Sequence, residues 1–143
     1  MNIGDIDDAS YRYKMPAIIS MNEGSGNGVK TVILNIEEIS RALYRDSTEI
    51  GKYLSLEMNT PMKYKKKEKR MVFNGQFTKS QLMECLKEYI KQYIICELCS
   101  LPETHYKIKK NIRKLCDACG HREKVSGNEK LNKYIKKQAC ADS

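Results

Sequence analysis

Four cysteines in the second half of the chain have the spacing of a metal site. They form two pairs, Cys96 with Cys99 and Cys116 with Cys119, and sixteen residues separate the pairs. Two thiolates with two residues between them can occupy two corners of a tetrahedron, so two such pairs complete the coordination of one Zn2+ ion. A site closed by four sulfurs leaves no position for a substrate. We therefore expect one structural zinc ion per chain, whose binding energy contributes to folding.

The other cysteines and the histidines do not extend this pattern. Cys85 lies in a predicted helix, where we expect it to pack, and Cys140 is expected to be a loose thiol near the end. His121 follows the second pair, but four sulfurs already saturate the ion, so we expect it at the surface of a turn. Gly120 fits a tight turn in which backbone amides approach the sulfurs. Redox chemistry is disfavoured, because neither pair lies in a βαβ pattern.

A glycine-rich segment superficially resembles a phosphate-binding loop. In that motif four residues separate the glycines and a lysine follows directly, whereas three residues separate Gly24 from Gly28 and Val29 precedes Lys30. The motif also opens a helix, while this segment enters a strand. We expect either a flexible hairpin turn or a close approach to another molecule. No nucleophile elbow or other catalytic constellation is present, so we expect no active site of the chain's own.

Hydrophobic patterning predicts an α+β fold: a small mixed α/β body followed by a C-terminal four-cysteine zinc ribbon. The predicted strands are 17–21, 29–34, 63–67 and 70–73, and the predicted helices are 35–44, about 48–58, 79–95 and 128–137. Asn35 with Glu38 is expected to form a capping box, and Thr48 is expected to cap the second helix. The predicted organisation is a disordered acidic tail (1–10), the body (11–92) and the ribbon with its C-terminal helix (93–143).

The chain has 143 residues, enough for one domain or two small ones. Its apolar stretches are a few residues long, whereas a membrane span needs about 20. The first ten residues carry three aspartates and no apolar core, which is not the pattern of a secretory signal. We therefore expect a cytoplasmic protein with no membrane partner.

Positive charge is the second chemical feature: 26 Lys and Arg stand against 18 Asp and Glu, a formal net charge of +8. One basic run contains Lys63, Lys65, Lys66, Lys67, Lys69 and Arg70, and the other contains Lys107, Lys109, Lys110, Arg113 and Lys114. A basic run is often only a solvated face, but two runs on strands or loops favour a polyanion such as RNA. Tyr64, inside the first run, can either stack on a base or face the core.

Several segments together resemble the N-terminal domain of eukaryotic translation initiation factor 5, in the family that also contains the beta subunit of initiation factor 2. They are Tyr11–Pro16, Gly26–Thr31, Lys52–Tyr53, Asn74–Gly75, Pro102–Thr104 and Cys116–Gly120. Their order is colinear and the resemblance covers about residues 9–137. The segment Tyr-Arg-Tyr-Lys-Met-Pro and the glycine loop are of the factor 5 type.

The resemblance implies a GTPase activator that is not itself an enzyme. Members of the family stimulate GTP hydrolysis by the gamma subunit of initiation factor 2, and the arginine that matches Arg12 is proposed to act there as a finger in trans. From physics alone, Arg12 is a solvated cation near the N-terminus, flanked by two tyrosines that hint at docking. Lysines that match Lys30 and Lys52 support the activity in the family.

The resemblance also implies RNA partners. The family's domain lies beside initiator tRNA on the small ribosomal subunit, near mRNA, and helps to hold the tRNA on the start codon. The RNA-facing positions carried over are Asn27 and Gly28 in the glycine loop and Lys69 and Arg70 in the basic ribbon. The family normally continues into a helical-repeat domain that binds the beta subunit of factor 2; the 143 residues do not include it, so we expect either a fragment of a longer protein or a minimal form.

Two other functions remain open at this point. The chain could be an assembly subunit like the beta subunit of factor 2, which would bind the gamma subunit constitutively. It could also be a zinc-ribbon RNA- or DNA-binding protein of another kind, with a salt-dependent affinity that is independent of factor 2.

Overall fold

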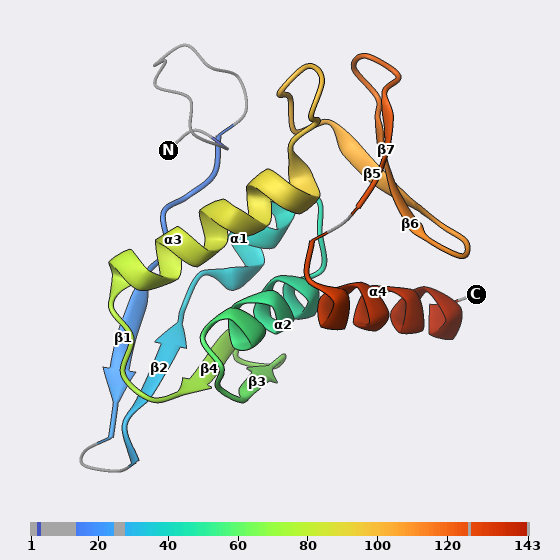
Figure 1. The fold of residues 1–143 in the computed structure, drawn as a ribbon. Helices are drawn as coiled ribbons and strands as arrows, with labels where there is room; N and C mark the ends of the chain where they lie inside the picture. The colour runs from blue at the N-terminus through green and yellow to red at the C-terminus, as the bar shows by residue number, and fades with distance from the viewer. Residues whose placement is uncertain (1–2, 4–13, 25–27, 126, 143) are drawn as a thin grey trace.

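The computed structural model describes residues 3, 14–24, 28–125 and 127–142, the last four by their backbone only. Two antiparallel sheets and four α-helices make up this part of the chain, which confirms the predicted α+β class (Figure 1). The elements in chain order are β1 (Ser20–Glu23), β2 (Lys30–Ile33), α1 (Ile36–Leu43), α2 (Ser47–Glu57), β3 (Met62–Lys65), β4 (Arg70–Asn74), α3 (Lys79–Tyr89), the π-helical segment η2 (Ile90–Ile94), β5 (Thr104–Ile108), β6 (Ile112–Cys116), β7 (Arg122–Lys124) and α4 (Glu129–Asp142).

The body is built on a four-stranded antiparallel sheet in the order β1-β2-β4-β3. Alternation along the strands gives this sheet a covered face and an open face. On the covered face Ile33 lies opposite Met71, and α2 packs so closely that a Cβ on Gly51 would overlap the Met71 side chain. The other face, which we call the open face because the helices pack on the opposite side, carries exposed cations at Lys30, Lys63, Lys65 and Arg70 around the buried Val32 and Val72.

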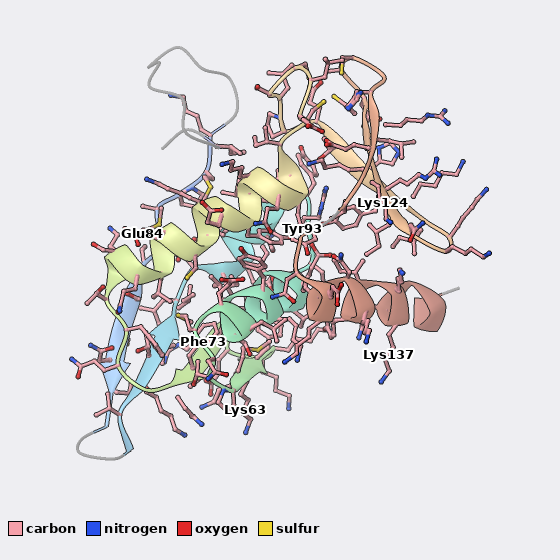
Figure 2. All side chains as sticks on the ribbon, viewed as in Figure 1. Lys63, Phe73, Glu84, Tyr93, Lys124 and Lys137 are labelled. Atoms are coloured by element: carbon pink, nitrogen blue, oxygen red, sulfur yellow. The ribbon has the colours of Figure 1, made fainter. Side chains whose placement is uncertain are left out.

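Tyr64 separates the two β3 lysines and takes the covered face, as strand alternation requires. Its ring is half-buried against the core, and its hydroxyl donates to the carboxylate of Glu37 on α1. Figure 2 shows Lys63 pointing outward from β3, while Phe73 of β4 lies among the core side chains. Of the two alternatives for Tyr64, the structure therefore gives inward packing and not an exposed stacking platform.

The predicted capping box at the start of α1 is wrong. Asn35 does occupy the N-cap position, but its side chain makes no capping hydrogen bond. Its amide instead donates to the Ala17 carbonyl (2.7 Å) and its oxygen accepts from the Ile19 amide (2.9 Å). A long-range pairing has outcompeted the local one, and it ties the segment before β1 to the first helix.

The cap of the second helix also differs from the prediction. Asp46, not Thr48, is the N-cap, and its carboxylate accepts from the backbone N–H and the hydroxyl of Thr48 (2.8 and 2.7 Å). A carboxylate at this position also interacts favourably with the helix dipole. The remaining helices lie close to their predicted ranges, although α4 continues to Asp142 and the long helix ends in the π-helical turn η2.

A cluster of three buried tyrosines joins the body to the ribbon. Tyr53 of α2, Tyr89 of α3 and Tyr93 of η2 are at most 1% exposed, with ring centroids 5.3–6.0 Å apart. The Tyr93 hydroxyl donates to Asn132 of α4 (2.7 Å), which packs against α2 (Figure 1). One hydrophobic core therefore runs from the sheet to residues of β6 and α4.

The predicted domain boundary between 92 and 93 falls within η2, and it remains a prediction. Of the predicted acidic tail, 1–10, the structure describes only Ile3, which is buried in this same core. No helix in the described ranges is long and apolar enough to cross a membrane.

Arg45, directly after α1, clamps the body to the first strand of the ribbon. Its guanidinium donates to the backbone carbonyls of Thr104 (3.1 Å) and Tyr93 (3.0 Å) and to the Thr104 hydroxyl (3.1 Å). The same group lies 4.2 Å from the centre of the Tyr106 ring, a cation–π contact. Bonds from one planar cation to two segments fix how the ribbon leaves the body.

Glu49 of α2 is a buried acid beside this clamp. Its carboxylate accepts from the hydroxyls of Tyr89 and Tyr106, the latter at 3.0 Å. Burial raises the pKa of Glu49 above its ordinary 4.5, because the charged form loses hydration, and the Tyr89 hydrogen bond and the Arg45 charge only partly oppose this. The folded state thus holds a proton on Glu49 more tightly than the unfolded state does.

The consequence is a pH dependence of stability. The contribution of Glu49 is fully present below its unfolded pKa and is lost as pH rises through the folded pKa. Glu49→Gln keeps a hydrogen-bond acceptor and cannot ionise, so we expect its Tm to rise relative to that of the natural chain between pH 5 and 8. Glu84→Gln, on the exposed side of α3, is the matched control for loss of one charge. A Tm difference that does not change with pH would contradict the burial argument.

Candidate functional site

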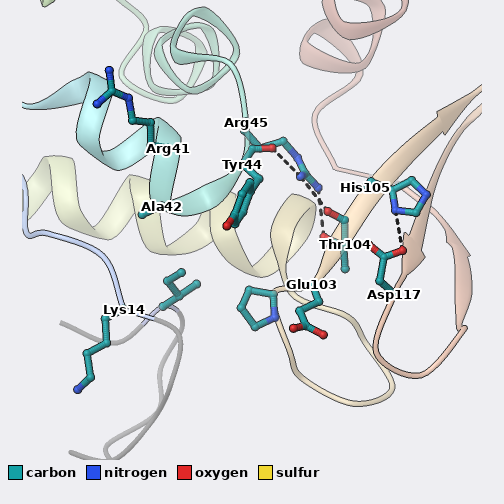
Figure 3. Close-up of a pocket in the computed structure, with 11 residues that line it drawn as sticks. Lys14, Arg41, Ala42, Tyr44, Arg45, Glu103, Thr104, His105 and Asp117 are labelled. Carbon is teal, nitrogen blue, oxygen red and sulfur yellow. Dashed lines mark hydrogen bonds and ion pairs between the residues drawn. The ribbon is translucent and has the colours of Figure 1, made fainter.

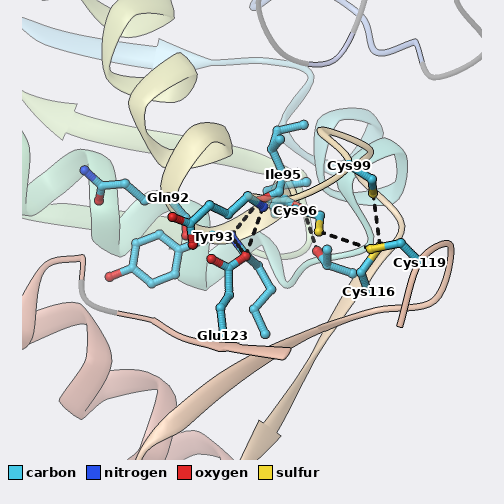
Figure 4. A network of polar contacts seen from close by, with 12 residues as sticks. Gln92, Tyr93, Ile95, Cys96, Cys99, Cys116, Cys119 and Glu123 are labelled. Carbon is cyan, nitrogen blue, oxygen red and sulfur yellow. Dashed lines mark hydrogen bonds and ion pairs between the residues drawn. The ribbon is translucent and has the colours of Figure 1, made fainter. Parts of the chain in front are cut away.

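The four cysteine sulfurs of the ribbon form one compact cluster. Cys96, Cys99, Cys116 and Cys119 each place one sulfur within 4.8 Å of the other three. The Cys96–Cys119 and Cys99–Cys116 separations are 3.7 and 3.5 Å. A tetrahedral ion with metal–sulfur bonds of about 2.3 Å needs sulfurs roughly 3.8 Å apart, so the cluster suits a metal ion of this kind. The predicted four-cysteine constellation is therefore brought together (Figure 4).

The two cysteine turns have the same backbone geometry. In the first, Ser100 N–H donates to the Cys96 carbonyl (2.9 Å) and Cys96 N–H to the Leu101 carbonyl (3.0 Å). In the second, Gly120 and Cys116 make the same two bonds, both at 2.9 Å. The residue after the second cysteine has a positive φ in each turn, +61° at Ser100 and +77° at Gly120.

The second turn therefore has the residue that this geometry favours, as the sequence predicted, while the first does not. Glycine adopts a positive φ without steric cost, whereas a residue with a Cβ is strained there. Backbone amides also reach the sulfurs, because those of Leu98 and His121 donate to Cys96 and Cys119. These donors stabilise the thiolate over the thiol, and the thiolate is the form that binds metal.

The prediction that the second basic run faces RNA is wrong for Lys114, which is buried. Its side chain is only 4% exposed, and the ammonium donates to the carbonyls of Gln92 (3.1 Å) and Ile95 (2.6 Å). It also pairs with Glu123 of β7 at 3.3 Å (Figure 4). Strand alternation turns Lys114 toward η2 and away from solvent. It holds the ribbon onto the end of η2 and is not part of an RNA-facing surface.

A cleft of about 690 Å³ lies between α1 and the start of the ribbon. Arg41, Tyr44 and Arg45 line it on one side, and Glu103 to His105 line it on the other (Figure 3). Tyr44 is 84% exposed, and His105 pairs with Asp117 at the rim (3.1 Å). Lys14, two residues after Arg12, also borders the cleft.

The remaining predicted site residues lie in different places. Arg12 and Asn27 are outside the described residues. Lys30 begins β2 on the open face of the body, whereas Lys52 lies on α2, which packs on the covered face. The structure therefore does not place these two lysines side by side.

The predicted RNA-facing residues lie at the two ends of the body sheet. Gly28 precedes β2 at the end where Lys30 pairs with Asn74. Lys69 and Arg70 lie at the other end: Lys69 in the turn between β3 and β4, and Arg70 as the first residue of β4. Arg70 reaches diagonally to Glu23 at the foot of the first hairpin (3.7 Å).

The fold and the sulfur cluster define a class of protein: an α+β domain that carries a four-cysteine ribbon. Comparison with known proteins narrows this class. The chain belongs to the family described as a domain found in initiation factors 2B and 5, which matches residues 4–122.

The relatives confirm the resemblance to initiation factor 5. Eukaryotic translation initiation factor 5 of Mus musculus is 36% identical over 141 residues, which cover 96% of this chain and 33% of that protein. The Caenorhabditis elegans factor is 37% identical over 92% of this chain and 30% of its own length. Probable eukaryotic translation initiation factor 5-1 of Arabidopsis thaliana is 39% identical, over 95% and 32%. The chain thus spans about a third of the length of these curated relatives, and it is an initiation factor 5-like domain.

The matched geometry of the two cysteine turns makes opposite substitutions informative. Ser100→Gly should raise the free energy of unfolding of the metal-loaded chain by about 0.5–1 kcal/mol, because it relieves a strained positive φ. Gly120→Ala should lower the free energy of unfolding by about 1 kcal/mol, because alanine is strained at this positive φ. A Cβ at this position meets no other atom within 4 Å, so the backbone strain is the whole effect. Urea unfolding measures both values. Equal signs for the two substitutions would contradict the shared geometry.

Metal content tests the cluster directly. Elemental analysis after gel filtration should give about one zinc per chain, and Cys99→Ser should lose most of it because only three sulfurs remain. Cys85→Ser, which changes a half-buried thiol of α3, is the matched control and should retain the metal. After chelation, amide hydrogen exchange should accelerate in β5–β7 more than in β2 and β4. A chelated chain with unchanged protection in the ribbon would contradict a structural role.

Proposed function

We propose that this chain stimulates GTP hydrolysis by the gamma subunit of initiation factor 2 in the preinitiation complex, and that it is not itself an enzyme. The observation that carries the proposal is the family match over residues 4–122, which includes Arg12, together with relatives named initiation factor 5 that align over more than nine-tenths of the chain. The four cysteines hold one structural zinc ion that stabilises the ribbon, and the complex forms in the cytoplasm.

Arg12 supplies a guanidinium in trans to the nucleotide of the partner. A planar, permanently charged group can donate two parallel hydrogen bonds to phosphoryl oxygens, on which negative charge develops in the transition state. Lys14 borders the cleft. Arg12 precedes Lys14 by two residues, which span at most about 7 Å of chain. A GTPase docked over this cleft therefore lies within reach of Arg12, and exposed Tyr44 offers it an aromatic anchor.

Lys30 and Lys52 support this activity through the partner's surfaces and not by sharing one phosphate. The Lys30 side chain takes the open face of the body sheet, whereas the helix that carries Lys52 packs on the covered face, which argues against a common small ligand. Lys30 faces the same side as the other cations of the open face, while Lys52 is half-buried on α2.

The open face of the body and its two turns contact RNA on the small ribosomal subunit. Asn27 and Gly28 approach initiator tRNA, and Lys69 and Arg70 contact the backbone of tRNA or mRNA. Gly24 and Gly28 have no side chains, so the backbone of this loop can approach another molecule closely. The two glycines also lie close to each other, because a Cβ on Gly24 would lie 2.5 Å from the Gly28 carbonyl oxygen. The open face supplies the positive potential that such a contact needs. The chain thereby stabilises the initiator tRNA at the start codon.

The test is GTP hydrolysis by a preinitiation complex that contains factor 2. Arg12→Ala should lower the stimulated rate by about 10³-fold, the lower end of the effect of arginine fingers in other GTPases. Arg12→Lys should recover little of it, because an ammonium cannot donate in the same forked geometry. Lys87→Ala, an exposed cation on α3, is the control for loss of one charge and should leave the rate unchanged.

Two outcomes would contradict the proposal. Equal stimulation by the natural chain and Arg12→Ala would remove the finger role. Stable co-purification with the gamma subunit, without any stimulated hydrolysis, would instead support an assembly subunit like the beta subunit of factor 2.

A further inference from the structure

The three-stranded sheet of the ribbon has two chemically different faces. In the order β5-β6-β7, alternate residues of each strand turn toward the body, among them the buried Ile112 and Lys114. The other residues turn outward and are cationic on every strand. We call these the outer face of the ribbon: Lys107 on β5, Arg113 on β6, Arg122 and Lys124 on β7, and Lys109 and Lys110 in the turn between β5 and β6.

Three of these cations lie side by side in one row across the sheet. Lys107 is the register partner of Arg113, and Arg113 is also the register partner of Lys124. Residues directly opposite on neighbouring strands have Cβ atoms about 5 Å apart, and like charges at this distance destabilise a sheet. All three side chains are exposed, and none forms an ion pair with another described residue.

The acids of the ribbon do not relieve this repulsion. Glu123 is adjacent to two of the cations in sequence, but its side chain points to the other face, where it pairs with Lys114 (3.3 Å). Asp117 lies beyond the end of β6 and pairs with His105. One acid therefore points inward and the other pairs with His105 on the edge strand β5, so neither forms an ion pair with the row of three cations.

The outer face is also hollowed. A depression of about 480 Å³ is lined by Lys107, Lys109, Lys110, Asn111, Arg113, Leu115 and Arg122. Every charged residue around it is a cation. Repulsion among closely spaced cations is relieved when a polyanion places negative groups between them, and a row of phosphates does this while releasing counterions.

Among the described residues of the ribbon, the outer face has no Phe, Tyr or Trp side chain on which an unpaired base could stack, and the imidazole of His105, which shares this face, is paired with Asp117. Tyr106, the aromatic residue of β5, turns inward, where its hydroxyl donates to Glu49 and its ring lies against Arg45. Single-strand binding usually combines a basic groove with aromatic stacking platforms, whereas duplex RNA is bound through its backbone and shape. A cationic face without Phe, Tyr or Trp platforms fits the second case.

We propose that the outer face of the ribbon binds the sugar–phosphate backbone of double-stranded RNA. This surface lies on a different sheet from the open face of the body, so it adds a second RNA contact to the proposed function. Its recognition does not depend on base sequence, because phosphate contacts carry no sequence information and the deep, narrow major groove of duplex RNA keeps side chains from the base edges. It also does not depend on Arg12 or on hydrolysis, so the two proposals can fail separately.

The experiment is fluorescence anisotropy with the zinc-loaded chain and a labelled 16-base-pair RNA duplex at several KCl concentrations. The row variant is Lys107→Gln with Arg113→Gln and Lys124→Gln. It should bind at least about tenfold more weakly at 100 mM KCl, and its plot of log affinity against log salt should be shallower by about 2–3, the slope expected from three phosphate contacts. Its Tm should not fall, since the substitutions remove repulsion within the sheet.

A control variant separates this surface from total charge. Lys79→Gln with Lys87→Gln and Lys91→Gln removes the same charge from exposed positions of α3 and η2, and it should keep the affinity and slope of the natural chain. Equal weakening by the two variants would overturn the proposal, because net charge alone would then explain binding. Tighter binding to a single strand of the same sequence would overturn the duplex preference. Competition by polyglutamate as effective as that by duplex RNA would assign the face to an acidic protein instead.

Discussion

The gathering of four cysteine sulfurs into one cluster that suits a metal ion is the constraint on which the ribbon depends. Between Cys96 and Val125 few apolar side chains are buried, and two of the cysteines are themselves among the buried residues. A three-stranded sheet with so little apolar contact does not hold a fixed shape in water by hydrophobic burial alone. The matching cysteine turns, the inward Lys114 and the outward cations all require that the four sulfurs remain together. The sulfur cluster therefore determines which side chains the ribbon offers to a partner.

The body has the opposite source of stability. Its sheet, its helices and the tyrosine cluster bury large side chains, and Tyr53, Tyr89 and Tyr93 place their rings in contact within it. This core extends to Ile112 of β6, Val125 and α4, so the ribbon is attached to the core of the body. Arg45 completes the joint by bonding to segments on both sides of it.

Local sequence patterns predicted the elements and the metal site well, because each depends on near neighbours. Cysteine spacing identified the four ligands, and alternation identified the strands. The errors came where a distant partner competed with a local one. Asn35 bonds to Ala17 and Ile19 instead of capping its helix, and Lys114 is buried by η2, which precedes it by about twenty residues. The capping box of Thr78 and Gln81 was readable in the sequence and was missed.

The cationic faces show why a charge count is a weaker guide than register. The second basic run contains five cations in sequence, yet the sheet removes Lys114 from it and adds Arg122 and Lys124 from β7. Likewise, Tyr64 lies within the first run in sequence, but in the fold its side chain packs against the core on the opposite face from the lysines of that run. Strand pairing, which joins residues far apart in the chain, decides the composition of each face, and a single sequence does not reveal that pairing.

The direct passage of η2 into the first cysteine turn has a mechanical consequence. Ile94 is buried in the core and Cys96, two residues later, is already in the sulfur cluster, so no flexible linker separates the two sheets. The open face of the body and the outer face of the ribbon are therefore held at a fixed separation. When one face binds an RNA backbone, the other face is at a high effective concentration for the same RNA, provided that the backbone passes both faces. An RNA whose backbone does not reach the second face gains nothing from it. For the RNA contacts proposed above, a fixed separation of this kind favours some RNA shapes over others, independently of base sequence.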